Sequence, residues 1–167
     1  MSDNIVLTGL MGCGKTSVGK ALSRILKDYT FIDVDDVIVD IESSSISDIF
    51  STKGEAYFRE IEKNIIKELS DEEDLIIALG GGAFEAAETR EVLSQTGIVF
   101  YLKANVETLY NRLKTDTTRP LLQSENPKET LKELLIKREP NYIKAEYTIE
   151  VDNKDINTIA EEILSII

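Results

Sequence analysis

Short apolar runs alternate along the chain with longer stretches in which apolar residues recur every three or four positions. Residues 4–8 (NIVLT) are mostly apolar and lead into a glycine-rich turn, a pattern typical of a buried strand in a parallel sheet. Four more runs of this kind predict further strands, at residues 30–34, 75–79, 98–102 and 147–151.

The stretches between these runs have the periodicity of helices. Residues 54–69 show it most clearly, because Phe58, Ile61, Ile65 and Leu69 fall on one helical face. The other predicted helices cover residues 15–27, 35–43, 45–52, 85–94, 106–113, 127 to about 138, and 156–167. The polar residues 115–126 predict a mobile loop.

This alternation of strands and helices predicts the fold class. It implies an α/β fold of three α/β/α layers, with a five-stranded parallel sheet covered on both faces by right-handed crossovers. We expect residues 1–167 to form a single domain, because no linker or internal repeat interrupts the alternation. Ligands of such sheets bind at the carboxyl ends of the strands, so the glycine turns after the first and third strands indicate one shared crevice.

Composition narrows the range of functions. A net charge of −12 argues against nucleic-acid binding, which needs a basic face, but not against small anionic substrates. The chain has no histidine, which excludes histidine-based catalysis, and one cysteine, which excludes an intrachain disulfide and fits a reducing compartment. No apolar run approaches the roughly 18 residues that span a bilayer. We therefore expect a cytoplasmic protein that binds neither nucleic acid nor membrane.

Residues 9–16, GLMGCGKT, fit the phosphate-binding pattern G-x-x-x-x-G-K-[ST] in full. The glycines of such a loop turn backbone N–H groups toward phosphate oxygens, Lys15 reaches the β and γ phosphates, and the Thr16 hydroxyl binds Mg²⁺. The pattern lies between a predicted strand and a predicted helix, as this mechanism requires. Cys13 occupies a variable position of the loop, and we interpret it as a small filler rather than a reactive thiol.

Three carboxylates, Asp33, Asp35 and Asp36, close the second predicted strand and admit two interpretations. In the first, one carboxylate serves Mg²⁺, directly or through water, and another serves an acceptor hydroxyl. In the second, the group caps a helix and fills its first turn with acids, which Asp36 fits best. The residues alone leave both interpretations open.

Arginines and glycines further along the chain likewise admit two interpretations each. Arg59, flanked by glutamates on its predicted helix, suits either a ligand contact or a surface ion pair. The three glycines at 80–82 indicate either a close approach to the backbone or a plain tight turn. Arg119 lies in the polar loop, where it could close over phosphates or simply be an isolated loop residue. Arg138 would end its helix, where a cation also suits the helix dipole.

Taken in order, these features resemble the shikimate kinase family, a small relative of the nucleoside monophosphate kinases. The matching segments are GLMGCGKTSVG, FIDVDD, SISDIF with GEAYFREIE, LGGGA, RPLL and KREPNY, which together span nearly the whole chain. The phosphate loop is shared by many nucleotide-binding proteins, whereas the ordered combination is much more specific. The resemblance implies Mg²⁺-dependent transfer of the γ-phosphate of ATP to the 3-hydroxyl of shikimate, giving shikimate 3-phosphate and ADP for chorismate biosynthesis.

The resemblance also implies roles for individual residues. ATP would be held by Gly12, Cys13, Gly14, Lys15, Thr16, Ser17, Arg112 and Arg119. Shikimate would be bound by Asp35, Arg59, Gly81, Gly82 and Arg138, and Mg²⁺ by Thr16 and Asp33. Lys15, Asp35 and Arg119 would be catalytic, with Asp35 orienting the reacting hydroxyl or accepting its proton. A substrate-binding region at about 33–60, a lid at about 112–126 and a monomeric enzyme are expected.

Two rival functions fit parts of the sequence. A kinase of the same fold acting on gluconate or a nucleotide would share the phosphate loop, but Arg59 and Arg138 favour an acceptor with a carboxylate, and the triple glycine favours shikimate. A nucleotide-binding module without catalysis would share the loop as well. The intact set of predicted catalytic residues argues against that module.

Overall fold

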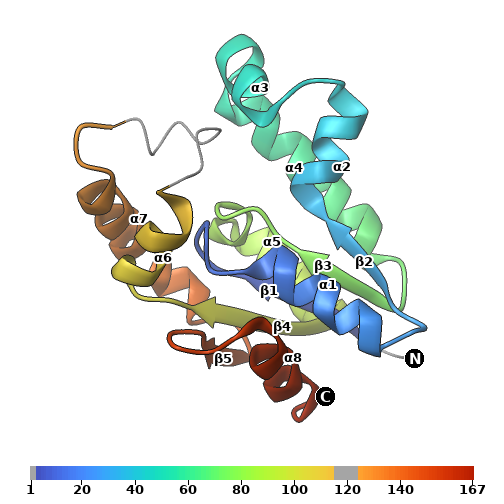
Figure 1. Ribbon diagram of the computed structural model, residues 1–167. Coiled ribbons are helices and arrows are strands. Elements are labelled where there is room, and N and C mark those ends of the chain that lie inside the picture. The colour runs from blue at the N-terminus through green and yellow to red at the C-terminus, as the bar shows by residue number, and fades with distance from the viewer. Residues whose placement is uncertain (1–2, 115–123) are drawn as a thin grey trace.

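The structure of the protein is a computed structural model, and it describes residues 3–114 and 124–167 (Figure 1). A sheet of five parallel strands runs through its centre in the order β2-β3-β1-β4-β5. The strands are β1 (Asn4–Thr8), β2 (Thr30–Asp33), β3 (Leu75–Ala78), β4 (Gly97–Lys103) and β5 (Tyr147–Glu150). The predicted fold class and all five predicted strands are confirmed.

The sheet is most deeply buried at its centre, as the apolar runs predict. Every residue of β1 and β3 is buried, whereas β2 and β5 form the two edges and are only partly covered. Ile5 lies opposite Ile76 on one side and Ile98 on the other. Burying an aliphatic side chain of this size stabilises the fold by about 1.5–3 kcal/mol, so the central strands anchor the loops at their carboxyl ends.

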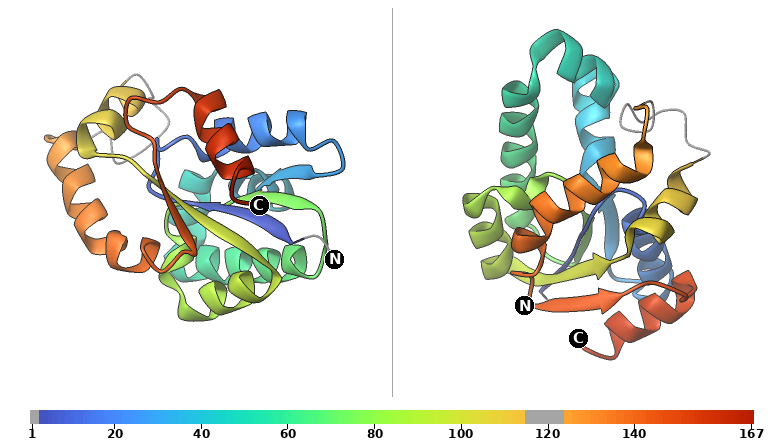
Figure 2. Two further views of the ribbon diagram at one scale, coloured as in Figure 1. Left: turned by 90° about the horizontal axis from the view of Figure 1, so that it is seen from below. Right: turned by 90° about the vertical axis from the view of Figure 1, so that its left-hand side faces the viewer.

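Helices cover both faces of the sheet, which gives the three predicted layers (Figure 2). One face carries α1 (Lys15–Ile25) packed against α8 (Ile156–Leu164), and the other carries α4 (Glu55–Ser70) packed against α5 (Ala87–Thr96). The remaining elements are α2 (Val34–Glu42), α3 (Ile46–Lys53), the 3₁₀ turn η1 (Ala83–Glu85), α6 (Val106–Leu113) and α7 (Pro127–Tyr142). Within the described ranges, no helix is long and apolar enough to cross a bilayer.

Several predicted helix boundaries were wrong. Helix α1 ends at Ile25 instead of residue 27, and α8 ends at Leu164 instead of residue 167. The helix expected at residues 85–94 is divided into η1 and α5. The helix expected to end near Arg138 continues as α7 to Tyr142, although Pro140 lies within its last turn. The Ile143 N–H still donates to the Glu139 carbonyl (3.1 Å), and Tyr142 is fully buried. Packing of Tyr142 therefore outweighs the local tendency of proline to end a helix.

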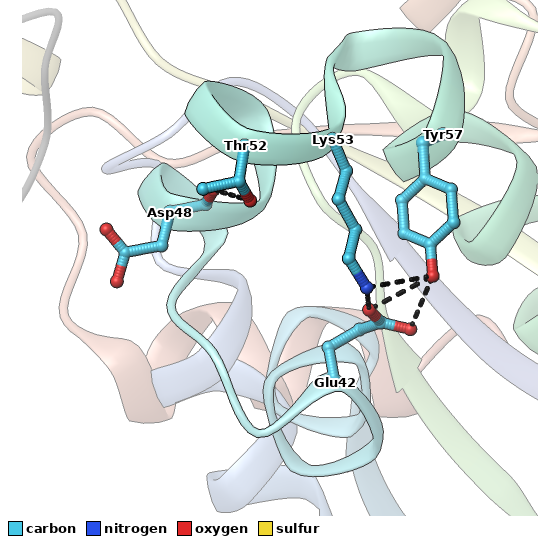
Figure 3. A network of polar contacts seen from close by, with 5 residues as sticks. All are labelled: Glu42, Asp48, Thr52, Lys53 and Tyr57. Carbon is cyan, nitrogen blue, oxygen red and sulfur yellow. Dashed lines mark hydrogen bonds and ion pairs between the residues drawn. The ribbon is translucent and has the colours of Figure 1, made fainter.

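Helices α2 and α3 and the adjoining part of α4 form a helical arm that extends beyond the sheet in Figure 1 and in the right-hand view of Figure 2, while the rest of α4 packs against α5. A polar network ties its far end together (Figure 3). Lys53 Nζ lies 2.9 Å from Glu42 Oε2 and donates to the Tyr57 hydroxyl (3.3 Å), which in turn donates to Glu42 Oε2 (3.1 Å). The hydrogen bond from Lys53 lowers the pKa of Glu42. The network thus links the end of α2 to the junction of α3 and α4.

Replacing Lys53 with Met keeps the apolar stem but removes the ammonium group from this network. We expect amide hydrogen exchange in α3 and the last turn of α2 to quicken by about twofold to fivefold, the range for one exposed ion pair, while the sheet stays unchanged. Thr52→Val is the matched control, because the Thr52 hydroxyl donates only to the Asp48 carbonyl (2.6 Å) within α3. Equal exchange in the two variants would show that the network does not hold the arm.

Candidate active site

The glycine-rich turn after β1 needs glycine for steric reasons. Gly9, Gly12 and Gly14 have φ angles of 144°, 84° and 103°, a region that side-chain-bearing residues rarely adopt. A Cβ on Gly12 would also lie 2.8 Å from the Leu113 side chain. Helix α1 begins directly after this turn, at Lys15, so its positive end faces the loop. The local geometry is that of a phosphate cradle.

Lys15 and Cys13 lie inside the cradle. The Lys15 ammonium donates to the carbonyls of Gly9 and Leu10, the latter at 3.3 Å, and lies 3.8 Å from Cys13 Sγ. Cys13 is 1% exposed, which confirms its interpretation as a small filler. The Cys13 N–H donates to the Leu10 carbonyl (3.2 Å) and so helps to close the turn.

Arg112 braces the same turn from α6. Its guanidinium donates to the carbonyls of Cys13 (3.0 Å) and Gly12 (3.4 Å). A Cβ on Gly14 would lie 3.2 Å from Arg112 Nη1, so this close approach also depends on glycine. Arg112 therefore holds carbonyl groups of the loop, a contact that sequence reasoning missed because the two segments are 99 residues apart in sequence.

Asp33 connects the phosphate loop to the helical arm. Its Oδ2 accepts a hydrogen bond from the Thr16 hydroxyl (2.8 Å), and its Oδ1 accepts one from the Asp35 N–H (3.0 Å), which makes it the N-cap of α2. The capping interpretation is thus confirmed in both of its parts, because Asp33 is the N-cap and Asp35 and Asp36 are the acids of the first turn. Because β2 ends at Asp33, Asp33 and Asp35 do not share a strand face.

Thr16 and Asp33 together suit Mg²⁺ in the way that nucleotide-binding sites usually hold this ion. Mg²⁺ there takes one or two protein ligands and completes its shell with water and phosphate oxygens. In residues 3–114 and 124–167, no three acidic, cysteine or histidine side chains gather into a dedicated metal cage. The donor set of a hydroxyl and a carboxylate beside a phosphate cradle is therefore suited to a metal that arrives with the nucleotide.

Each glycine of residues 80–82 makes room for a charged side chain. A Cβ on Gly80 would lie 2.8 Å from Asp35 Oδ1, and one on Gly81 would lie 3.0 Å from Arg138 Nη1. A Cβ on Gly82 would lie 2.3 Å from Arg59 Nη2. The alternative of a plain tight turn is wrong, because three helices bring charged groups onto this backbone.

Arg59 reaches this glycine turn from α4, and its ion pair is only partly a surface one. The guanidinium lies 3.7 Å from the exposed Glu55 and 2.8 Å from Glu62, which is 3% exposed. The interpretation of Arg59 as a mere surface ion pair is therefore wrong for its shorter contact. Burial raises the pKa of Glu62, and the negative charge of Asp35 raises it further, whereas Arg59 and Arg138 act in the opposite direction.

Arg138 meets Arg59 at one cavity. Because α7 continues for four residues beyond Arg138, this arginine is not in the last turn, and the prediction that it complements the helix end is wrong. Arg138, Arg59, Glu62 and Gly82 all line a cavity of about 450 Å³ between α4, η1, α5 and α7. Two arginines from different helices beside a turn of bare backbone are a set of donors that suits a carboxylate.

The sequence matches a family of kinases. The family model described as shikimate kinase matches residues 11–167. A shikimate kinase from Thermodesulfovibrio yellowstonii is 45% identical over 96% of this chain and 92% of its own length. The chain belongs to the shikimate kinase family. A further shikimate kinase, from Caldanaerobacter subterraneus, is 40% identical over 96% of this chain and 94% of its own.

Solved structures agree with this membership. Shikimate kinase from Acinetobacter baumannii in complex with shikimate has a TM-score of 0.94 and 41% identity, covering 99% of this chain and 93% of that one. A gluconokinase from Sinorhizobium meliloti has a TM-score of 0.61 at 19% identity, covering 98% and 90%, which shows a shared fold alone. The shikimate kinases are thus much nearer than the gluconokinase fold relative.

Compared with the site predicted from the sequence of this shikimate kinase, the structure adds one residue and leaves one predicted segment undescribed. Glu62 was not predicted as a site residue, although a carboxylate between Phe58 and Ile65 on an apolar face is a usable signal. The residues predicted around the two glycine turns come together as expected. Arg119 and most of the predicted lid lie outside the described residues.

Replacing Glu62 with Gln tests the electrostatics of this shikimate kinase site without any ligand. A raised pKa means that the folded protein holds the proton more tightly than the unfolded chain, so stability falls as pH rises above the ordinary value of 4.5. Glutamine removes this titration. We therefore expect the unfolding free energy of E62Q, relative to the original protein, to be higher at pH 7.5 than at pH 4.

Urea denaturation at the two pH values measures this difference. Glu60→Gln is the matched control, because it removes one negative charge from an exposed position of the same helix. If the relative stability of E62Q instead fell with rising pH, the attraction of Arg59 would outweigh the burial of the carboxylate.

Proposed function

We propose that this protein transfers the γ-phosphate of ATP to the 3-hydroxyl of shikimate, giving shikimate 3-phosphate and ADP. The observation that carries the proposal is the convergence of Arg59 and Arg138 on the glycine turn at residues 80–82. Shikimate carries a carboxylate, which suits two arginines, and hydroxyls, which suit Asp35 and backbone amides. The relative of 41% identity in complex with shikimate supports the same acceptor.

In this proposal, the nucleotide lies on the cradle between β1 and α1. Backbone groups of Gly12, Cys13, Gly14 and Ser17 surround its phosphates, Lys15 and Arg119 are their cationic partners, and Arg112 lies beside the adenine. Thr16 and Asp33 would hold Mg²⁺, which shields phosphate charge when bound. Lys15 would leave its present carbonyl partners and meet the β and γ phosphates.

The acceptor would lie between the helical arm and α7. Arg59 and Arg138 would bind its carboxylate, while Gly81 and Gly82 offer backbone contacts and Asp35 orients the reacting hydroxyl. That oxygen forms a bond to the γ-phosphorus as the bond to the β-phosphate oxygen breaks, and its proton passes to Asp35. Phosphoryl transfer depends mainly on alignment and charge neutralisation, so a chain without histidine has the groups it needs.

Two longer segments also have proposed roles. We propose that residues 33–60 form the substrate-binding region and that residues 112–126, with Arg119, form a lid that excludes water from the γ-phosphate. A single-domain, monomeric, cytoplasmic enzyme remains our prediction.

A coupled assay of ADP release tests the substrate. With Mg²⁺ and ATP, ADP formation should require shikimate and should fall to background when the metal is chelated. Gluconate and a nucleoside monophosphate serve as the rival acceptors. Turnover of either rival at a rate equal to or above that with shikimate would reject the assignment.

Replacing Asp35 with Asn tests the catalytic role of this carboxylate against a role as a mere acid in the first turn of α2. We expect kcat to fall by roughly 10²- to 10⁴-fold and shikimate to bind more weakly, because the amide does not accept the proton. Binding of ATP without shikimate should change little. Asp36→Asn is the matched control in the same helical turn, and it should keep nearly full activity. Activity of D35N within about threefold of the original enzyme would rule out a catalytic role for this carboxylate.

A further inference from the structure

We propose that the Tyr142 hydroxyl positions the acceptor pocket by holding Arg138 and the Gly81 carbonyl in one arrangement. Tyr142 was not among the predicted site residues. The part of this inference that concerns shikimate rests on the proposed function, whereas the part that concerns the loop does not.

The geometry at Tyr142 joins two components of the pocket. Tyr142 follows Arg138 by four positions on α7, so both side chains project from the same helical face. The Tyr142 hydroxyl donates to the Gly81 carbonyl at 2.5 Å. The Arg138 guanidinium lies beside the same glycine, because a Cβ on Gly81 would lie 3.0 Å from Arg138 Nη1 and 3.8 Å from the Tyr142 hydroxyl. A phenolic oxygen has one proton to donate and can accept from a guanidinium, so one hydroxyl is able to hold both groups.

This contact also determines the direction of the next amide. The Gly81 carbonyl and the Gly82 N–H belong to one planar peptide unit and point in opposite directions. Holding the carbonyl toward Tyr142 therefore aims the Gly82 N–H away from it. Without the tether, this peptide unit would be restrained only by the turn around it, in which the Ala83 N–H donates to the Gly80 carbonyl (3.2 Å), and glycine itself has few steric limits on its backbone angles.

The environment of Tyr142 favours a positioning role over an acid–base role. Burial raises the pKa of Tyr142, although the nearby Arg138 acts in the opposite direction. The hydroxyl therefore keeps its proton at neutral pH and remains a donor to the Gly81 carbonyl. A group that does not titrate near neutral pH is poorly suited to proton transfer, but it remains a constant hydrogen-bond donor.

The Tyr142 ring is held from behind by a second tyrosine. Its ring stacks on Tyr101 with centroids 5.0 Å apart, and both side chains are almost completely buried. The Tyr101 hydroxyl donates to Glu139 (3.1 Å), which also lies 3.5 Å from the ammonium of Lys103. Tyr101 thus supports the same stack but directs its hydroxyl away from the glycine turn, which makes it a matched control.

The test compares Tyr142→Phe with Tyr101→Phe, both of which keep the stacked rings. For Y142F, we expect the Kd and KM of shikimate to rise by about 5- to 30-fold, as for the loss of a hydrogen bond beside a charged group. The KM of ATP should stay within about twofold. Y101F should leave both substrates within about twofold. Equal losses of shikimate affinity in the two variants would reduce Tyr142 to a packing residue and overturn the proposal.

A double variant tests whether the effect passes through Arg138. In the Arg138→Ala background, Tyr142→Phe should weaken shikimate binding less than it does alone, because the two residues share one interaction. Full additivity, together with an unchanged glycine turn, would overturn the positioning role.

A measurement without ligand separates this inference from the substrate assignment. The ¹⁵N resonance of Gly82 reports on the hydrogen bond of the Gly81 carbonyl, so it should shift in Y142F and not in Y101F. If the enzyme prefers another acceptor, this result still stands, whereas an unchanged Gly82 resonance overturns the tether itself. Should Y142F fail to fold, fluorotyrosine-labelled protein replaces it. The Tyr142 signal must then move more than the Tyr101 signal on adding shikimate, and equal shifts count against the proposal.

Discussion

Three charged side chains approach the backbone of residues 80–82 closely because these residues have no side chains. Asp35 comes from α2, Arg59 from α4 and Arg138 from α7, and an atom of each lies within 3.0 Å of the place that a Cβ of one of these glycines would take. A larger residue at any of the three positions would force the charged group to shift. Three helices therefore converge on one turn because that turn offers only backbone. The entropic cost of three glycines, about 0.5–1 kcal/mol each, is offset by a site that no bulkier turn would allow.

Within this pocket, charge is nearly balanced even though the whole chain carries −12. Two arginines face Asp35 and the buried Glu62, and Glu62 in turn fixes the position of Arg59 through a 2.8 Å contact. The burial of Glu62 destabilises its charged form, as the raised pKa indicates. An incoming carboxylate would add a third negative charge beside two cations. Its binding therefore depends on fixed arginines rather than on a general positive field, because the surrounding surface is acidic.

The sequence predicts the fold well because its signals are local. The apolar run of β1 and the helical period of α4 depend on neighbouring residues, and each corresponds to an element of the structure. The boundary of α7 was missed because its end is determined by burial of Tyr142, a tertiary effect that outweighs Pro140.

In the candidate site, too, the residues that could be predicted are those with a local signal in the sequence. The phosphate loop is a contiguous motif, so its residues could be named from spacing alone. Arg112 acts through carbonyl groups 99 and 100 residues away in sequence, which no linear pattern shows, whereas the only sequence signal for Glu62 is its position on the apolar face of α4. The family resemblance supplied Arg59 and Arg138. Residue-level reasoning alone gave each a local explanation, which holds for Arg59 only in its exposed pair with Glu55 and does not hold for Arg138.

One carboxylate is hydrogen-bonded both to the nucleotide side and to the acceptor side of the site. Asp33 accepts from Thr16 in the phosphate loop with one oxygen and caps α2 with the other. Any ligand that draws its Oδ2 away from the Thr16 hydroxyl also changes the position of the cap on the Asp35 N–H. The first turn of α2 carries Asp35, and α2 is the beginning of the helical arm. The nucleotide side and the acceptor side of the site are therefore connected through one residue and its two hydrogen bonds.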